Sequence, residues 1–162
     1  NNGSCDIKSV SKKYAVVTLY YGTTYTNFHL TVTMTPLHDA SKGDYYGYGV
    51  VFRSTADEAH YYVFEVSTAG GGNFRFLRND GDAKWKHIDE GSAPSLLPSL
   101  AQKIIITIDT VGNTFIFFIN GKPIKTISDP PKSALTSGYI GLYVEGQGTE
   151  VTFSNLQVQQ LS

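Results

Sequence analysis

The chain has 162 residues, of which 41% are hydrophobic and 13% aromatic, and its formal net charge at pH 7 is −1. This length suits one folded domain, and the apolar content argues against disorder. The near-neutral charge excludes a basic field for nucleic acid or an anionic membrane, and the single cysteine, Cys5, excludes an intrachain disulfide and a cysteine-based zinc site.

The N-terminal part begins with a polar stretch, so residues 1–13 are predicted to be an extension or linker and residues 14–162 the folded domain. Tyr14–Tyr21 is apolar almost throughout and predicts a strand. Phe28–Thr35 alternates between apolar and polar residues, as a half-buried strand does. No run approaches the roughly 20 apolar residues that a membrane-spanning helix needs.

Three further strands are predicted over Tyr45–Ser54, Tyr61–Ser67 and Asn73–Asn79, separated by polar or glycine-rich turns. Successive side chains of a strand point to opposite faces, so apolar residues such as Phe52 and Phe64 are expected in the core. The charged residues expected on the other face of these strands are Arg53, Glu65 and Arg75.

The next elements are a short strand around Trp85, an irregular connection over Asp89–Gln102, and a meander of three strands. The meander strands are Ile104–Asp109, Thr114–Asn120 and Pro123–Ser128. They are separated by Gly112-Asn113 and Asn120-Gly121, and Asn-Gly between apolar runs is typical of a type I′ hairpin turn. The middle strand is apolar on both faces, which favours a position away from the sheet edge.

A loop from Asp129 then leads to a strand with Ile140 and Leu142 inward and Tyr139 and Tyr143 outward. The last strand runs to Val158 with a bulge expected near Asn155. No amphipathic helix of ten or more residues is predicted, so the chain is expected to be an all-β sandwich or barrel.

The order of these segments resembles the concanavalin A-like lectin/glucanase superfamily, in particular its bacterial laminin G-like, 3-keto-disaccharide hydrolase-like branch. The resemblance implies a jelly-roll β-sandwich of two antiparallel sheets, one of which presents a curved face where relatives bind or cleave carbohydrate. It covers nearly the whole chain from Tyr14. The segments that carry it are 49–53, 61–67, Trp85, 112–121, Asp129, 138–142 and 151–156.

Carbohydrate recognition combines aromatic rings, which stack on the C–H faces of a sugar, with fixed donors and acceptors for its hydroxyls. The candidate binding residues are Arg53, Glu65, Arg75, Trp85, Tyr61, Tyr48 and Tyr143. In a simpler interpretation, Arg53 and Glu65 form only a cross-strand ion pair and Trp85 only plugs the sandwich.

No catalytic residue is assigned, because the Glu-x-Asp-x-x-Glu spacing of laminarinases and lichenases is absent. Neither Glu65 nor Glu145 has acidic residues beside it at this spacing. Glu65 is the candidate catalytic residue only if the protein is an enzyme. The four histidines show no metal-ligand spacing. No cofactor is expected except a possible structural calcium, whose ligands the sequence does not assemble. The aspartates available for it are Asp39, Asp44, Asp80, Asp82, Asp89, Asp109 and Asp129.

The leading hypothesis is a non-catalytic carbohydrate-binding, lectin-like module, expected to be an accessory domain of a larger bacterial protein that is secreted or at the cell surface. Its expected partner is an oligo- or polysaccharide. The alternatives are an enzyme that cleaves a glycoside or modified disaccharide, and a laminin G-like protein-interaction module.

Overall fold

The computed structural model describes residues 3–40, 47–69, 71–82, 84–97 and 99–162, and these residues form β-strands and no α-helix. No helix in them has the length and apolar character to cross a membrane. The strands are β1 Cys5–Lys8, β2 Val16–Tyr25, β3 Phe28–His38, β4 Tyr48–Ser54, β5 His60–Ser67, β6 Asn73–Asp80, β7 Trp85–Ser92, β8 Ile104–Val111, β9 Thr114–Ile119, β10 Lys122–Ser128, β11 Gly138–Val144 and β12 Glu150–Gln160.

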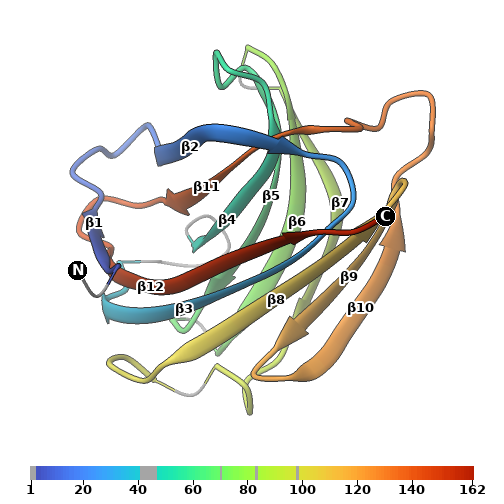
Figure 1. Ribbon diagram of the computed structural model, residues 1–162. Helices are drawn as coiled ribbons and strands as arrows, with labels where there is room; N and C mark the ends of the chain where they lie inside the picture. The colour runs from blue at the N-terminus through green and yellow to red at the C-terminus, as the bar shows by residue number, and fades with distance from the viewer. Residues whose placement is uncertain (1–2, 41–46, 70, 83, 98) are drawn as a thin grey trace.

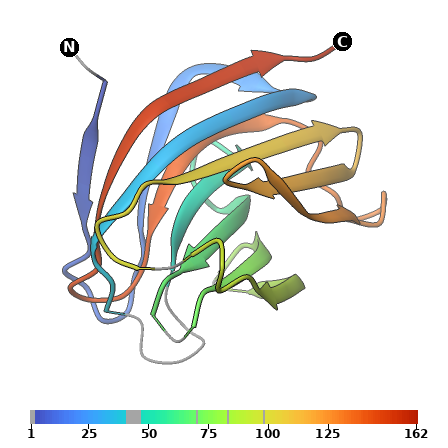
Figure 2. The ribbon, with the colours of Figure 1, turned by 90° about the horizontal axis from the view of Figure 1, so that it is seen from below.

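These strands form two antiparallel sheets of six strands each (Figure 1). Sheet A has the order β1-β12-β3-β8-β9-β10, and sheet B has the order β2-β11-β4-β5-β6-β7. Seen from below, the sheets are two curved layers (Figure 2). The predicted all-β jelly-roll sandwich is therefore confirmed.

The predicted meander is formed by β8, β9 and β10, with β9 between its two neighbours. Ile119 pairs with Lys122, so Asn120-Gly121 is a two-residue turn. Its φ angles are 51° and 76°, and a type I′ turn requires positive φ at both positions. The β8–β9 turn differs, because only its Gly112 has positive φ, at 59°.

Aromatic rings fill much of the core between the sheets. Phe115 and Phe117 of β9 are fully buried and face Phe52, Phe64 and Phe76 of sheet B. The rings of Phe64 and Phe117 stack with their centroids 4.2 Å apart and 9° between their planes. The inward faces predicted for these strands are thus confirmed.

A buried ion cluster fastens the loop that joins sheet A to sheet B between β10 and β11. Asp129 in this loop has no exposed surface. It accepts a hydrogen bond from Tyr62 at 2.7 Å, and it forms ion pairs with Lys86 at 3.0 Å and with Arg78. Burial alone would raise the pKa of Asp129, but Tyr62, Lys86 and Arg78 hold it below the ordinary 3.8. The cluster therefore stabilises the fold above about that pH, and its contribution is lost as the pH falls through the lowered pKa.

Two segments differ from the sequence prediction. The range 1–13, predicted to be an extension or linker, contains β1, which pairs with β12 and places Ile7 opposite Val151. A strand this short gives almost no periodic signal. The strand around Trp85 runs on to Ser92, into the predicted irregular connection. Tyr45 and Tyr46 of the strand predicted over Tyr45–Ser54 lie outside the described residues.

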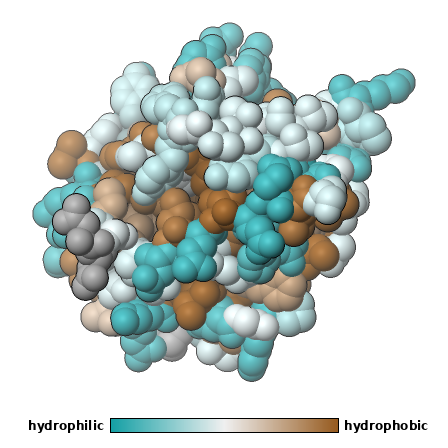
Figure 3. All heavy atoms as spheres, viewed as in Figure 1, coloured by the Kyte–Doolittle hydropathy of each residue, from teal (hydrophilic) through white to brown (hydrophobic). Residues whose placement is uncertain are grey.

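Both ends of the chain belong to sheet A, through β1 and β12. In Figure 1, β1 lies on the left side of the molecule and the C-terminus lies on the right. A cleft of about 830 Å³ lies between β2, the edge strand of sheet B, and the part of β12 that β1 does not cover. Its lining includes Cys5, Tyr20, Ile140 and Leu156. Figure 3 shows hydrophobic atoms exposed across the middle of this side.

We predict that Phe117→Ala will destabilise the protein by about 3 to 5 kcal/mol, because it leaves a cavity beside Phe64 in a closely packed core. Phe118→Ala on the same strand is the matched control, since Phe118 faces outward and is only half-buried. Denaturant unfolding measures both variants. Equal losses would contradict the assignment of the two faces of β9.

Candidate functional site

The face of sheet B that is turned away from sheet A, here called the outer face, carries side chains in three rows across the strands. The first row is polar and includes Tyr143, Glu65, Arg75 and Glu90. The second row is apolar and includes Leu19, Val51, Val63 and Leu77. The third row is mostly aromatic and includes Tyr21, Tyr139, Tyr61 and Trp85. The outer face therefore holds five of the seven predicted site residues, namely Glu65, Arg75, Trp85, Tyr61 and Tyr143.

Arg53 does not lie on this face, so its predicted placement is wrong. Its φ of 51° accompanies an irregularity in the pairing of β4 with β11, where Ser54 pairs with Tyr139 and Val51 with Gly141. The extra residue on β4 breaks the alternation and turns the Arg53 side chain inward. The residue is only 1% exposed.

The guanidinium of Arg53 is fully engaged in structural contacts. It donates hydrogen bonds of 2.6 to 3.2 Å to the carbonyl oxygens of Thr26, Gly112 and Leu135. Its central carbon also lies 5.2 Å from the ring centroid of Phe115. Arg53 therefore ties three loop segments to the end of the core and pairs neither with Glu65 nor with solvent.

Tyr48, which was also predicted to bind carbohydrate, does not lie on the outer face. Its side chain is fully buried between the sheets with Val50 and Phe52, and its hydroxyl donates a hydrogen bond of 3.4 Å to Thr68. The period of two already gives Tyr48 the same face as Val50 and Phe52, which the sequence places in the core. A ring in this position cannot stack on a ligand.

Glu65 and Arg75 form the ion pair that the simpler interpretation assigned to Arg53 and Glu65. They lie directly opposite each other on β5 and β6, and Arg75 Nη2 contacts Glu65 Oε1. Glu65 is only 1% exposed. A Cβ at Gly47 would lie 2.9 Å from Glu65 Oε2, so glycine at this position leaves room for the carboxylate.

Glu145 also belongs to this site, although the sequence indicates no partner for its carboxylate. It directly follows β11, accepts a hydrogen bond of 3.1 Å from the Tyr143 hydroxyl, and lies 4.0 Å from Arg75 Nη2. Its backbone N–H donates to the carbonyl of Gly47 at 2.9 Å. The outward position of Glu145 follows from the alternation in β11, but its approach to Arg75 depends on long-range strand order.

The two carboxyl groups differ from ordinary glutamates in their pKa. Burial raises the pKa of Glu65 to about 7, because it outweighs the opposing charge of Arg75. Burial likewise raises the pKa of Glu145, although the Tyr143 hydroxyl and Arg75 oppose the change. The pKa of Tyr143 is itself raised by burial and by the nearby Glu65 and Glu145. Near neutral pH, Glu65 can therefore both take up and release a proton.

A pocket of about 440 Å³ opens at the polar end of the outer face. Charged, hydroxyl and amide side chains line it, together with the backbone of two glycines. The lining residues that carry the argument are Gly47, Glu65, Asn73, Arg75, Glu90 and Ser92. Such a concave site with a few converging polar groups is typical of small-molecule binding.

Trp85 lies on the outer face of the edge strand β7 and is 37% exposed, so it does not plug the sandwich. Its ring meets that of Tyr61 edge-on, with centroids 5.8 Å apart. Tyr21 and Tyr139 form a second such pair at 5.2 Å, which the sequence analysis did not select. Rings at the surface of one face provide stacking partners for a flat ligand.

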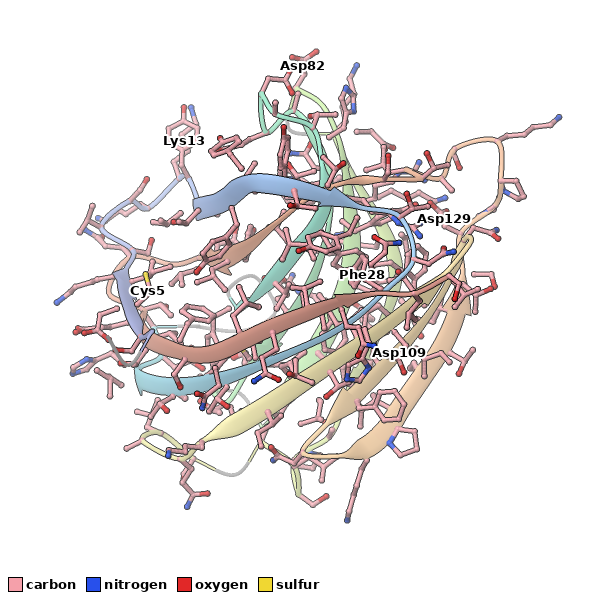
Figure 4. The ribbon with its side chains drawn as sticks, viewed as in Figure 1. Cys5, Lys13, Phe28, Asp82, Asp109 and Asp129 are labelled. Carbon is pink, nitrogen blue, oxygen red and sulfur yellow. The ribbon has the colours of Figure 1, made fainter. Side chains whose placement is uncertain are left out.

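No group of three or more His, Cys, Asp or Glu side chains in the described ranges is arranged to hold a metal ion. Asp44, one of the aspartates considered for calcium, lies outside these ranges, and the calcium site stays a prediction. Asp109, another of these aspartates, contacts a histidine: its Oδ1 lies 2.5 Å from His29 Nδ1 on the outward side of sheet A (Figure 4).

Residues 7–159 match the family described as the 3-keto-alpha-glucoside-1,2-lyase-like domain. The chain belongs to this family. The match agrees with the 3-keto-disaccharide hydrolase-like branch that the sequence resembles. No sequence of the curated proteins matches the chain.

Solved structures share the fold of this family member at low sequence identity. A carbohydrate-binding module, CBM66 from Bacillus subtilis, aligns with a TM-score of 0.68 and 17% identity over 99% of this chain and 84% of its own. A putative glycosyl hydrolase from Parabacteroides distasonis aligns with a TM-score of 0.67 and 14% identity over 99% and 88%. A human galectin-16 variant aligns with a TM-score of 0.59 and 13% identity over 96% and 100%.

We predict that the buried carboxyl of Glu65 makes the protein less stable as the pH rises. Its folded pKa of about 7 exceeds the ordinary 4.5, so the folded state holds the proton more tightly between these values. Relative to Glu65→Gln, the free energy of unfolding should fall by on the order of 2 to 3 kcal/mol between about pH 5 and about pH 8.

Denaturant unfolding of both proteins across this pH range measures the difference. Glu90→Gln is the control, because it removes an exposed carboxylate from the same face. A constant difference between wild type and Glu65→Gln would show that the Glu65 pKa is not raised.

Proposed function

We propose that this protein binds a saccharide on the outer face of sheet B, as a lectin-like module. The observation that carries the proposal is the polar pocket around Glu65 and Arg75, which shares a face with the exposed ring of Trp85. A sugar needs both features, because it offers hydroxyls to polar groups and C–H faces to aromatic rings.

The comparisons with known proteins also support the proposal that the protein binds a saccharide. The family is described by a reaction of a glucoside, and the structural neighbours include a protein described as a carbohydrate-binding module and another described as a putative glycosyl hydrolase. The proposed setting is a non-catalytic accessory domain of a larger extracellular protein, as the sequence resemblance implies.

We predict that Trp85→Ala weakens saccharide binding by roughly tenfold, because it removes an exposed aromatic surface from the outer face. A glycan array identifies the ligand, and calorimetric titration gives the affinity. Tyr20→Ala is the control. Tyr20 is also an exposed aromatic residue of sheet B, but it lines the cleft beside β12 and does not lie on the outer face. Wild-type protein that binds nothing across a broad glycan panel would contradict the proposal.

Catalysis is the second candidate function, and one observation favours it. Glu65 lies on β5 and Glu145 directly follows β11, both pair with the guanidinium of Arg75, and both have raised pKa values. Elimination from a 3-keto-α-glucoside takes the proton from C2, breaks the C1–O bond and returns a proton to the departing oxygen. Two carboxyl groups of this kind can serve as the base and the acid.

If the protein is such an enzyme, Glu65→Gln should lower the release of the alcohol from an α-glucoside oxidised at C3 by at least a hundredfold, since it removes a proton acceptor. Chromatography of the released alcohol measures the rate. Glu150→Gln, on sheet A, should leave the rate unchanged. Concentrated wild-type protein that releases no alcohol would leave binding as the function.

A further inference from the structure

The carboxylate of Glu65 has an unusual environment for a buried charged group. Its Oε1 is paired with Arg75, whereas Oε2 has no hydrogen-bond partner among the described residues. Oε2 lies against the backbone of Gly47 and belongs to a residue that lines the pocket. Buried polar atoms in proteins are nearly always paired, so this oxygen is available for a donor that enters the pocket.

The charges around Glu65 indicate which donor fits best. Glu145 lies on one side and Glu90 at the rim of the pocket, and Arg75 is the cation in contact with this group. In the described part of the site, three carboxylates therefore face one guanidinium, which already contacts two of them. A uronate or sulfate group would meet like charges here, whereas a cation would be attracted.

An ammonium group matches this environment in both charge and hydrogen bonding. It carries three N–H donors and no acceptor, so it can supply the donor that Glu65 Oε2 lacks. The other titratable groups near Glu65 are the hydroxyls of Tyr61, on the same strand β5, and Tyr143, on β11, and burial keeps both protonated by raising their pKa. Asn73 and Ser92 line the same pocket and supply neutral partners for sugar hydroxyls.

We propose that the saccharide bound in this pocket carries a free amino group, as a glucosamine residue does, and that its ammonium is received by Glu65 with Glu145 beside it. The inference rests on the proposed saccharide binding and defines the class of sugar. The inference distinguishes glucosamine from three otherwise similar sugar units. A glucose unit has an uncharged hydroxyl in place of the amino group, an N-acetylglucosamine unit has a neutral amide there, and a glucuronate unit carries a negative charge.

The test is calorimetric titration of the intact chain with four oligosaccharides of equal length, built from glucosamine, N-acetylglucosamine, glucose or glucuronate. The glucosamine oligomer should bind at least tenfold more tightly than the glucose oligomer, and the glucuronate oligomer should bind most weakly. Titration at about pH 5.5, where the amino group is already protonated and Glu65 still holds its proton, in two buffers of different ionisation enthalpy should show proton release with glucosamine alone, because an ammonium stabilises the ionised form of Glu65.

Glu65→Gln should remove both the preference for glucosamine and the proton release while the circular dichroism spectrum stays native. Glu150→Gln on sheet A is the matched control and should keep both. Equal binding of the glucosamine and glucose oligomers would overturn this inference and leave saccharide binding intact. Absence of binding to all four oligomers and to a broad glycan panel would instead remove the proposed function itself.

Discussion

The packing of aromatic rings between the two sheets is the constraint on which the rest of this structure depends. Rings of β9 lie against rings of β4, β5 and β6, with Phe64 and Phe117 in face-to-face contact. Because neighbouring residues of a strand alternate between its faces, fixing Phe64 and Phe76 inward also fixes Glu65 and Arg75 outward. The position of the candidate site is therefore a consequence of the core, and the site is built on strands that cannot shift without disturbing it.

Local chemistry was sufficient to predict most of the fold. The Asn-Gly turn, the alternation in β3 and the aromatic faces of β4 to β6 each depend on neighbouring residues, so they are readable from the sequence. The short strand β1 was missed because its place in the sheet comes from pairing with β12, at the far end of the chain. Such pairing has no local signature.

The candidate site shows the same division between local and distant causes. Glu65 and Arg75 were found because their strands follow each other in the sequence and alternate regularly. Arg53 was misplaced because one residue with left-handed backbone geometry reverses its side chain, and arginine gives no sign of that geometry. Glu145 was left without partners because β11 reaches β4 only after the chain has completed most of sheet A.

The placement of both chain ends on sheet A has a practical consequence. Neither β1 nor β12 contributes to sheet B, so a tag, a surface linker or a fused neighbour can extend from either end without crossing the polar pocket or the ring of Trp85. The molecule can thus be anchored to a sensor chip through either terminus with the outer face of sheet B directed into solution, and the two orientations should report the same affinity for a ligand of that face.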